Sequence, residues 1–144
     1  MGAFAGCAAG LHLEAAGPSH APAIFRDPDL EAEVALVEIP QTTGQVDSPS
    51  SALALELHNR SATPIELRSS GLILIGPDHR MVPQAIGHGI ERLTPGERAS
   101  LRLPPLSRPL RPGDAIELVL PTVVRSIPRD YHFRIRVRRG RPSQ

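Results

Sequence analysis

The sequence predicts an all-β domain: a seven-stranded immunoglobulin-like or fibronectin-like β-sandwich behind a flexible N-terminal arm. Three observations predict it. From about residue 31 onward, short segments carry apolar residues at every second position, and a period of two is that of a half-buried strand. Turns rich in Pro and Gly separate these segments, and none has the apolar spacing of an amphipathic helix. About seven short strands joined in this way are typical of a sandwich, with a closed barrel as the second candidate.

The predicted strands follow one another along the chain. They are expected near residues 33–39, 53–58, 65–68, 72–75, 99–103, 116–120 and 131–138, with a return strand beginning at 81–82. The last of them alternates most regularly, with four apolar side chains inward and four polar ones outward. The inward set is Tyr131, Phe133, Ile135 and Val137, and the outward set is His132, Arg134, Arg136 and Arg138.

Two predicted turns have the same residue order. Residues 93–97 and 110–114 both place Pro and then Gly at the centre and an acidic residue at the end. Pro presets the φ angle of the first central position, and Gly supplies the positive φ that a type II turn requires at the second. Each turn is therefore expected to lead into a strand.

The N-terminal 30 residues differ from the rest. They are rich in Ala, Gly, Pro and His and show no clean period, which predicts a flexible tether. The expected organisation is a lipobox-like start and tether over 1–30, the sandwich over 31–139 and a short tail over 140–144.

Cys7 is the only cysteine, which excludes an intramolecular disulfide and multi-cysteine zinc sites. Residues 4–7, Phe-Ala-Gly-Cys, resemble a bacterial lipobox, in which small residues precede a cysteine that becomes lipidated. A secretory signal needs a basic and an apolar region upstream of its cleavage site, so this interpretation places a start codon before Met1. The alternative is an accidental Gly-Cys in an Ala-rich arm.

The sequence of residues 57–65, Leu-His-Asn-Arg-Ser-Ala-Thr-Pro-Ile, resembles a segment of small bacterial envelope modules with an immunoglobulin-like fold. In those modules a Pro-Asp-Gly turn follows, and then a Leu-x-Pro-Gly-Glu turn. Here Pro77, Asp78 and His79 match the first turn with His in place of Gly, and residues 93–97 match the second. The resemblance covers about residues 50–120 and implies a fold and an envelope location. Such modules are often lipoproteins, in agreement with the interpretation of Cys7.

A second resemblance concerns copper. His79 and Met81 form a His-x-Met pair, with His88 further along, and imidazole with thioether is a donor set suited to copper(I). Periplasmic copper chaperones with a cupredoxin-like sandwich use such pairs and carry a Pro-Leu-x-x-Gly-Asp phrase similar to residues 109–114. Their later His and Met ligands have no counterpart here. The alternative places His79 in a turn and Met81 in the core.

Other function classes lack support. The sequence contains no nucleophile elbow, zinc-protease motif or phosphate-binding loop, so neither an enzyme nor a cofactor is expected. Net charge is near +1 and only 3% of residues are aromatic, which argues against a nucleic-acid partner.

Arg134, Arg136 and Arg138 form a cationic stripe on one face of the last strand. The stripe has two interpretations: a solvated face or charged edge that deters strand addition, or a patch for an anionic partner.

Together these features predict a non-enzymatic envelope lipoprotein, anchored in the membrane at Cys7, that binds a protein partner or serves in assembly. The first alternative is the copper chaperone using His79 and Met81. The second is a soluble cytoplasmic sandwich domain whose start is Met1.

Overall fold

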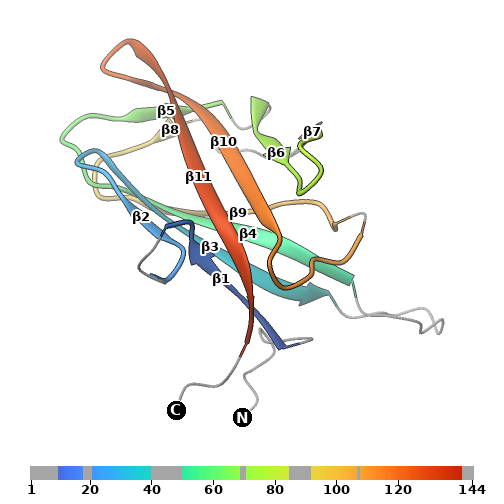
Figure 1. The fold of residues 1–144 in the computed structure, drawn as a ribbon. Helices are drawn as coiled ribbons and strands as arrows, with labels where there is room; N and C mark the ends of the chain where they lie inside the picture. Colours follow the sequence, from blue (N-terminus) through green and yellow to red (C-terminus); the bar gives the residue numbers. More distant parts are fainter. Residues whose placement is uncertain are drawn as a thin grey trace.

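The computed structural model describes residues 10–17, 21–39, 50–68, 71–84, 92–106 and 108–140. This part of the chain is all β, without an α-helix, and therefore without a helix able to cross a membrane (Figure 1). Its strands are β1 (Leu11–Ala15), β2 (Ile24–Arg26), β3 (Leu30–Ile39), β4 (Ser50–Asn59), β5 (Ile65–Leu67), β6 (Ile73–Ile75), β7 (Met81–Pro83), β8 (Arg92–Leu93), β9 (Arg98–Arg102), β10 (Ala115–Val124) and β11 (Ile127–Arg139).

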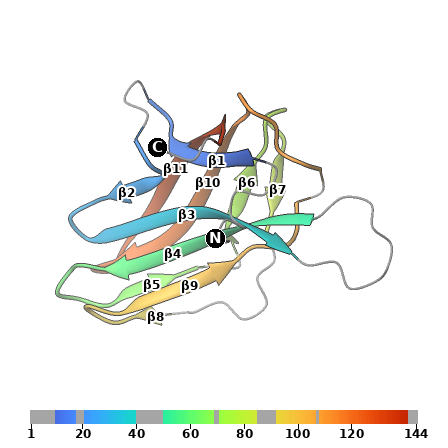
Figure 2. The ribbon, with the colours of Figure 1, turned by 90° about the horizontal axis from the view of Figure 1, so that it is seen from below.

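The strands form two antiparallel sheets. Sheet A has the order β1-β11-β10-β5-β8, and β6 and β7 extend it from β10 beside β5. The short strands β5 and β6 both pair with β10, at 122–124 and 117–119 respectively, so β10 carries two separate extensions. Sheet B has the order β2-β3-β4-β9. Figure 2 shows the two sheets as facing layers.

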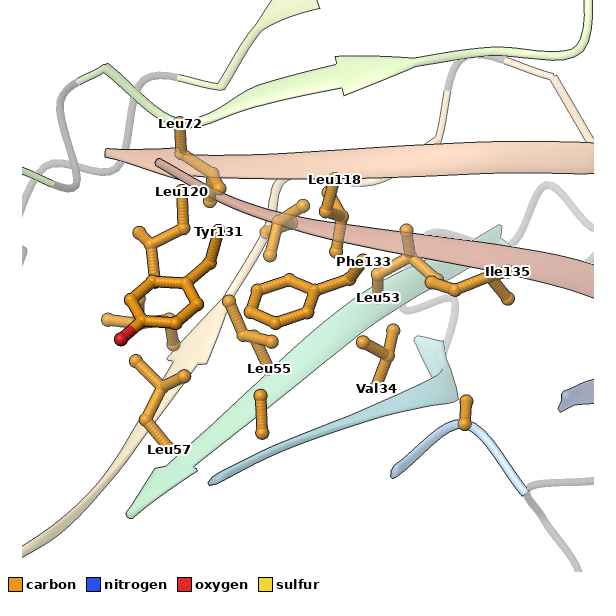
Figure 3. Close-up of a cluster of buried hydrophobic side chains, with 14 of the residues drawn as sticks. Val34, Leu53, Leu55, Leu57, Leu72, Leu118, Leu120, Tyr131, Phe133 and Ile135 are labelled. Carbon is orange, nitrogen blue, oxygen red and sulfur yellow. The ribbon is translucent and has the colours of Figure 1, made fainter. Parts of the chain in front are cut away.

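The core lies between the sheets and is mainly aliphatic. Inward residues of β4 meet those of β10 and β11, as Figure 3 shows for Leu55, Leu118 and Phe133, each at most 3% exposed. The period of two predicts these positions because successive side chains of a strand point to opposite faces. The inward set expected for β11 is confirmed: its four members are at most 7% exposed.

The N-terminal boundary differs from the prediction. β1 and β2 fall within the expected tether, and β1 pairs along its length with the end of β11, from Leu11 opposite Arg139 to Ala15 opposite Ile135. Leu11 and Leu13 belong to the buried core. The sandwich therefore begins near residue 10. The alternation of β1 includes only two large apolar residues, Leu11 and Leu13, which is too short to be recognised without its partner strand. Residues 1–9, with Cys7, lie outside the described part.

The strand count also differs, with eleven strands in the described part of the chain against the seven expected. β1, β2 and β8 were not predicted, and each has at most five residues. The coarser prediction, an all-β chain folded as antiparallel sheets, is confirmed.

Both Pro-Gly turns are confirmed. Gly96 and Gly113 have φ angles of 80° and 94°, and the N–H groups of Glu97 and Asp114 donate to the carbonyls of Thr94 and Arg111. The closing acidic side chains also accept hydrogen bonds at 2.8 Å. Glu97 accepts from the backbone N–H of Thr94, and Asp114 accepts from that of Arg111. The final acidic residue thus stabilises the turn.

Asn59 joins two loops at one end of the sandwich. Its side chain is fully buried, and its Nδ2 donates to the carbonyls of Thr63 and Leu93, both at 2.9 Å. Its Oδ1 accepts from the backbone N–H and the hydroxyl of Ser61, both at 2.8 Å. All the polar atoms of the amide are therefore satisfied within the protein.

Candidate binding face

The cationic stripe lies on the outer face of sheet A. Arg134, Arg136 and Arg138 point away from the core on β11, which lies between β1 and β10. β11 is therefore not an edge strand, and the interpretation of the stripe as a charged edge is wrong. The interpretations that remain are a solvated face and a patch for a partner.

Acidic residues on the neighbouring strands partly neutralise this stripe. Arg138 Nε lies 3.0 Å from Glu14 Oε1 on β1. On β10, Glu117 Oε2 lies 3.7 Å from Arg134 Nε and 2.7 Å from His132 Nδ1. The Nε of Arg136 is buried and has no hydrogen-bond partner among the described residues. The stripe keeps a cationic excess, because two carboxylates face three guanidinium groups.

The same face becomes apolar beyond β10. Facing residues of adjacent strands share one side of a sheet. The register therefore places two rows of residues across β11, β10, β6 and β7. The first row is Arg134, Glu117, Ile75 and Met81, and the second is His132, Val119, Ile73 and Pro83. We call the apolar residues of these two rows the apolar stripe; its members are Ile73, Ile75, Met81, Pro83 and Val119. None of the five is buried, and Met81 is 60% exposed.

Met81 and His79 lie on the β6–β7 hairpin, and both side chains are exposed. The alternative that placed Met81 in the core is therefore wrong. His79 has a φ angle of 66°, a left-handed conformation that Gly adopts most easily. No group of three or more His, Cys, Asp or Glu side chains suited to a metal is found within the described ranges. His88 lies outside them, so the copper site stays a prediction.

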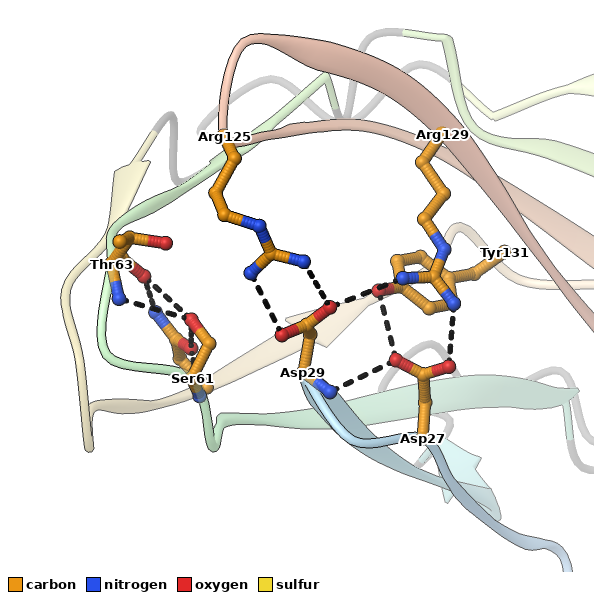
Figure 4. A network of polar contacts seen from close by, with 8 residues as sticks. Asp27, Asp29, Ser61, Thr63, Arg125, Arg129 and Tyr131 are labelled. Atoms are coloured by element: carbon orange, nitrogen blue, oxygen red, sulfur yellow. Dashed lines mark hydrogen bonds and ion pairs between the residues drawn. The ribbon is translucent and has the colours of Figure 1, made fainter.

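The structure reveals a polar network that the sequence did not predict. It joins the segment between β2 and β3 to the β10–β11 hairpin (Figure 4). Arg125 makes a bidentate contact with the carboxylate of Asp29, both bonds at 3.1 Å. Arg129 bridges Asp29 at 3.2 Å and Asp27 at 2.6 Å. The Tyr131 hydroxyl donates to Asp27 at 3.2 Å.

This network shifts the ionisation equilibria of Asp29, Arg125 and Tyr131. The hydrogen bonds and charge of Arg125 hold the pKa of Asp29 below its usual value. Burial, with the nearby negative charge of Asp27, raises the pKa of Tyr131 to about 12. Both carboxylates of the network, Asp27 and Asp29, have an arginine partner. We therefore interpret the network as a structural connection that holds the two sheets together. The two partners of each contact between the sheets lie 96 or more positions apart in sequence, and no local pattern predicts such pairs.

Comparison with known proteins adds a fold likeness only. No family model matches the chain, and no curated protein matches it. An X-ray structure of a target of the Northeast Structural Genomics Consortium is similar, with a TM-score of 0.53, 15% identity, and 81% of this chain and 90% of that chain covered. The putative ApaA protein from Bordetella pertussis has a TM-score of 0.53 at 18% identity, with 80% and 96% of the two chains covered. The TM-scores support a similar fold, and at these sequence identities the similarity assigns no function.

Proposed function

We propose that this chain is a non-enzymatic, protein-binding module of the bacterial cell envelope. Its docking surface is the outer face of sheet A, where the apolar stripe lies beside the cationic stripe. The finer description of the sandwich as immunoglobulin-like or fibronectin-like, and the lipid anchor at Cys7, belong to the same proposal.

The 60% exposure of Met81, on the outermost strand of the apolar stripe, is the observation on which the proposal depends. A hydrophobic side chain exposed alone is ordinary, whereas a contiguous apolar patch bordered by charge marks an interaction surface. Met and Arg are both enriched at protein interfaces. The flexible thioether of Met81 adapts to the shape of a partner, and the flanking arginines favour an acidic rim on that partner.

Site-specific photo-crosslinking in the native cell tests the docking surface. A photoreactive phenylalanine analogue replaces Met81 in one variant and Arg98 in the control. Arg98 is an exposed residue on β9, in the opposite sheet. We expect a discrete adduct from position 81 that disappears when Ile75→Glu is added, and none from position 98. Equal adducts from both positions, or none from position 81, would refute the proposed surface.

Intact mass and cell fractionation test the envelope location, with the protein expressed from its own locus together with the upstream sequence. A mature chain that begins at Cys7 and carries a diacylglycerol-sized mass supports the lipoprotein. A chain that begins at Met1 or Gly2 and does not partition with membranes would contradict it and favour the cytoplasmic alternative.

A further inference from the structure

A cleft of about 490 Å³ opens on the other side of β7. It lies between the inner face of the β6–β7 hairpin and the segment that leads from β9 to β10, which Figure 2 shows near each other at one side of the molecule. Its volume falls in the range of small-ligand sites, roughly 300–1,000 Å³. Val82 and Pro83 line it, whereas Met81 belongs to the apolar stripe alone. The cleft and the proposed docking face therefore meet at Pro83, and Val82 and Met81 point to opposite sides of the same strand.

The floor of this cleft is aliphatic. Leu74 and Ile116 form its buried base, and Leu106 and Leu110 are partly buried around them. Val82 is 42% exposed, although it lies opposite the buried Leu74 in the strand register. None of the residues that line the cleft belongs to a strand of sheet B, so this valine stays partly exposed and leaves apolar surface accessible to a ligand.

The rim of the cleft carries net positive charge, because three arginines and two aspartates line it. The aspartates already have partners: Asp78 accepts from the backbone N–H of Arg80 and lies 3.7 Å from Arg108, and Asp114 accepts from the backbone N–H of Arg111. Within the described part of the chain, the guanidinium groups of Arg80 and Arg111 lie within 4.0 Å of no carboxylate, although the charge of Arg80 helps to lower the pKa of Asp78. Two charge-assisted donors are thus available beside an apolar floor.

The backbone of the cleft is poor in hydrogen-bond donors. Five of its lining residues are prolines, which have no N–H group; they are Pro77, Pro83, Pro104, Pro105 and Pro109. The amide of the buried Gln84 already donates to the carbonyl of Val82. The main-chain carbonyls of a peptide would find few backbone donors here, whereas a hydrocarbon chain requires none.

We propose that this cleft binds a medium-chain fatty carboxylate, with the alkyl chain on the aliphatic floor and the carboxylate at Arg80 and Arg111. The proposal is independent of the docking face on the outer side of sheet A. The prolines restrict the backbone around the cleft, which lowers the conformational entropy lost on binding.

Calorimetric titration of the full chain with decanoate, below its aggregation concentration, tests the proposal. We expect saturable one-to-one binding that strengthens about fourfold for each methylene added between octanoate and decanoate, the value for burial of a methylene. Decanoate should bind at least about tenfold more tightly than decyl alcohol, because charge-assisted hydrogen bonds are the stronger class. In nitrogen-15 correlation spectra the amide signals of Val82, Leu106 and Leu110 should shift first.

Paired variants separate the site from general adsorption. Arg80→Gln with Arg111→Gln should reduce decanoate affinity about tenfold, to that of the alcohol. The control, Arg98→Gln with Arg102→Gln, removes the same charge from the opposite sheet and should leave the affinity unchanged. Val82→Asp, at an exposed position, should abolish binding while the chain stays folded.

Three results would overturn the proposal. The first is equal binding of decyltrimethylammonium, which would show that charge plays no part. The second is equal loss of affinity in the two arginine pairs. The third is tighter binding of an apolar tetrapeptide with a free carboxylate than of decanoate, which would assign the cleft to a peptide terminus.

Discussion

The alkaline stability of the fold should depend on one side chain. Tyr131 is 7% exposed, its hydroxyl donates to Asp27, and its pKa rises from 10.0 to about 12. In the unfolded chain the phenol ionises near its ordinary value. Between the two values the unfolded state has lost a proton that the folded state retains, so the free energy of unfolding falls as the pH rises through this window.

The magnitude follows from the two values. A difference of one pKa unit corresponds to about 1.4 kcal/mol, so the free energy of unfolding should fall by about 2 kcal/mol between about pH 9 and pH 12. The composition of the chain leaves few other groups that titrate at this pH. The chain has one tyrosine, no tryptophan and no lysine, so Tyr131 is the side chain expected to titrate in that window.

The assay is urea unfolding at a series of pH values, for the native sequence and for Tyr131→Phe. At neutral pH the variant should lose about 1 kcal/mol, the value of one hydrogen bond. Its free energy of unfolding should stay flat through this window and exceed that of the native sequence above about pH 11. Phenolate absorbance of the folded chain should rise only toward pH 12. A phenolate midpoint near 10 in the folded state, or an equal alkaline decline in the variant, would refute the argument.

Three further predictions concern stability, each measured by urea unfolding. Asn59→Ala removes four side-chain hydrogen bonds of a fully buried residue and should cost about 3–4 kcal/mol; a loss below about 1 kcal/mol would show that water replaces the amide. His79→Gly relieves a left-handed conformation and should stabilise by about 1 kcal/mol; no gain would mean that the turn relaxes. Folding lowers the pKa of Asp29. The carboxylate of Asp29 therefore contributes fully to the free energy of unfolding above its pKa in the unfolded chain, about 4, and this contribution is lost as the pH falls through its pKa in the folded chain. In Asp29→Asn the free energy of unfolding should therefore decline less steeply at acidic pH, and an unchanged decline would contradict this role of Asp29.

The sequence predicts the parts of the fold that local patterns encode. Alternation locates β4, β9, β10 and β11, and the Pro-Gly pairs locate the turns that include Gly96 and Gly113. These signals succeed because the period of a strand and the φ angle of a glycine are properties of a few adjacent residues. The stripe of Arg134, Arg136 and Arg138 follows from the same alternation.

The remainder depends on contacts between distant residues. β1 is recognisable only beside β11, and the apolar stripe exists only because the register brings Met81 and Ile75 beside Glu117 and Arg134. The neighbour of a strand is decided by the whole topology, so a cationic stripe in sequence does not reveal whether its strand is an edge. The pair His79 and Met81 illustrates the same point, since a His-x-Met pair predicts a copper site only where a third donor converges on it.

The β10–β11 hairpin shows how a distant contact replaces a local signal. Its two central residues, Arg125 and Ser126, have φ angles of 52° and 65°. Two positive φ values are those of a type I′ turn, which normally carries Asn-Gly; Arg-Ser gives no such signal, and the turn was not predicted. Arg125 contacts Asp29 through two hydrogen bonds, whereas Ser126 makes no side-chain hydrogen bond within the described residues. We infer that the contact with Asp29 stabilises the left-handed conformation of Arg125.

Glycine substitutions at the two turn positions test this inference. Ser126→Gly removes strain alone and should stabilise by about 1 kcal/mol. Arg125→Gly removes the same strain together with both bonds to Asp29, so it should destabilise the native sequence. In an Asp29→Ala background those bonds are already absent, and Arg125→Gly should become stabilising. A double-mutant cycle measures this change of sign. If Arg125→Gly destabilised both backgrounds equally, the turn would owe its conformation to packing of the hairpin and not to Asp29.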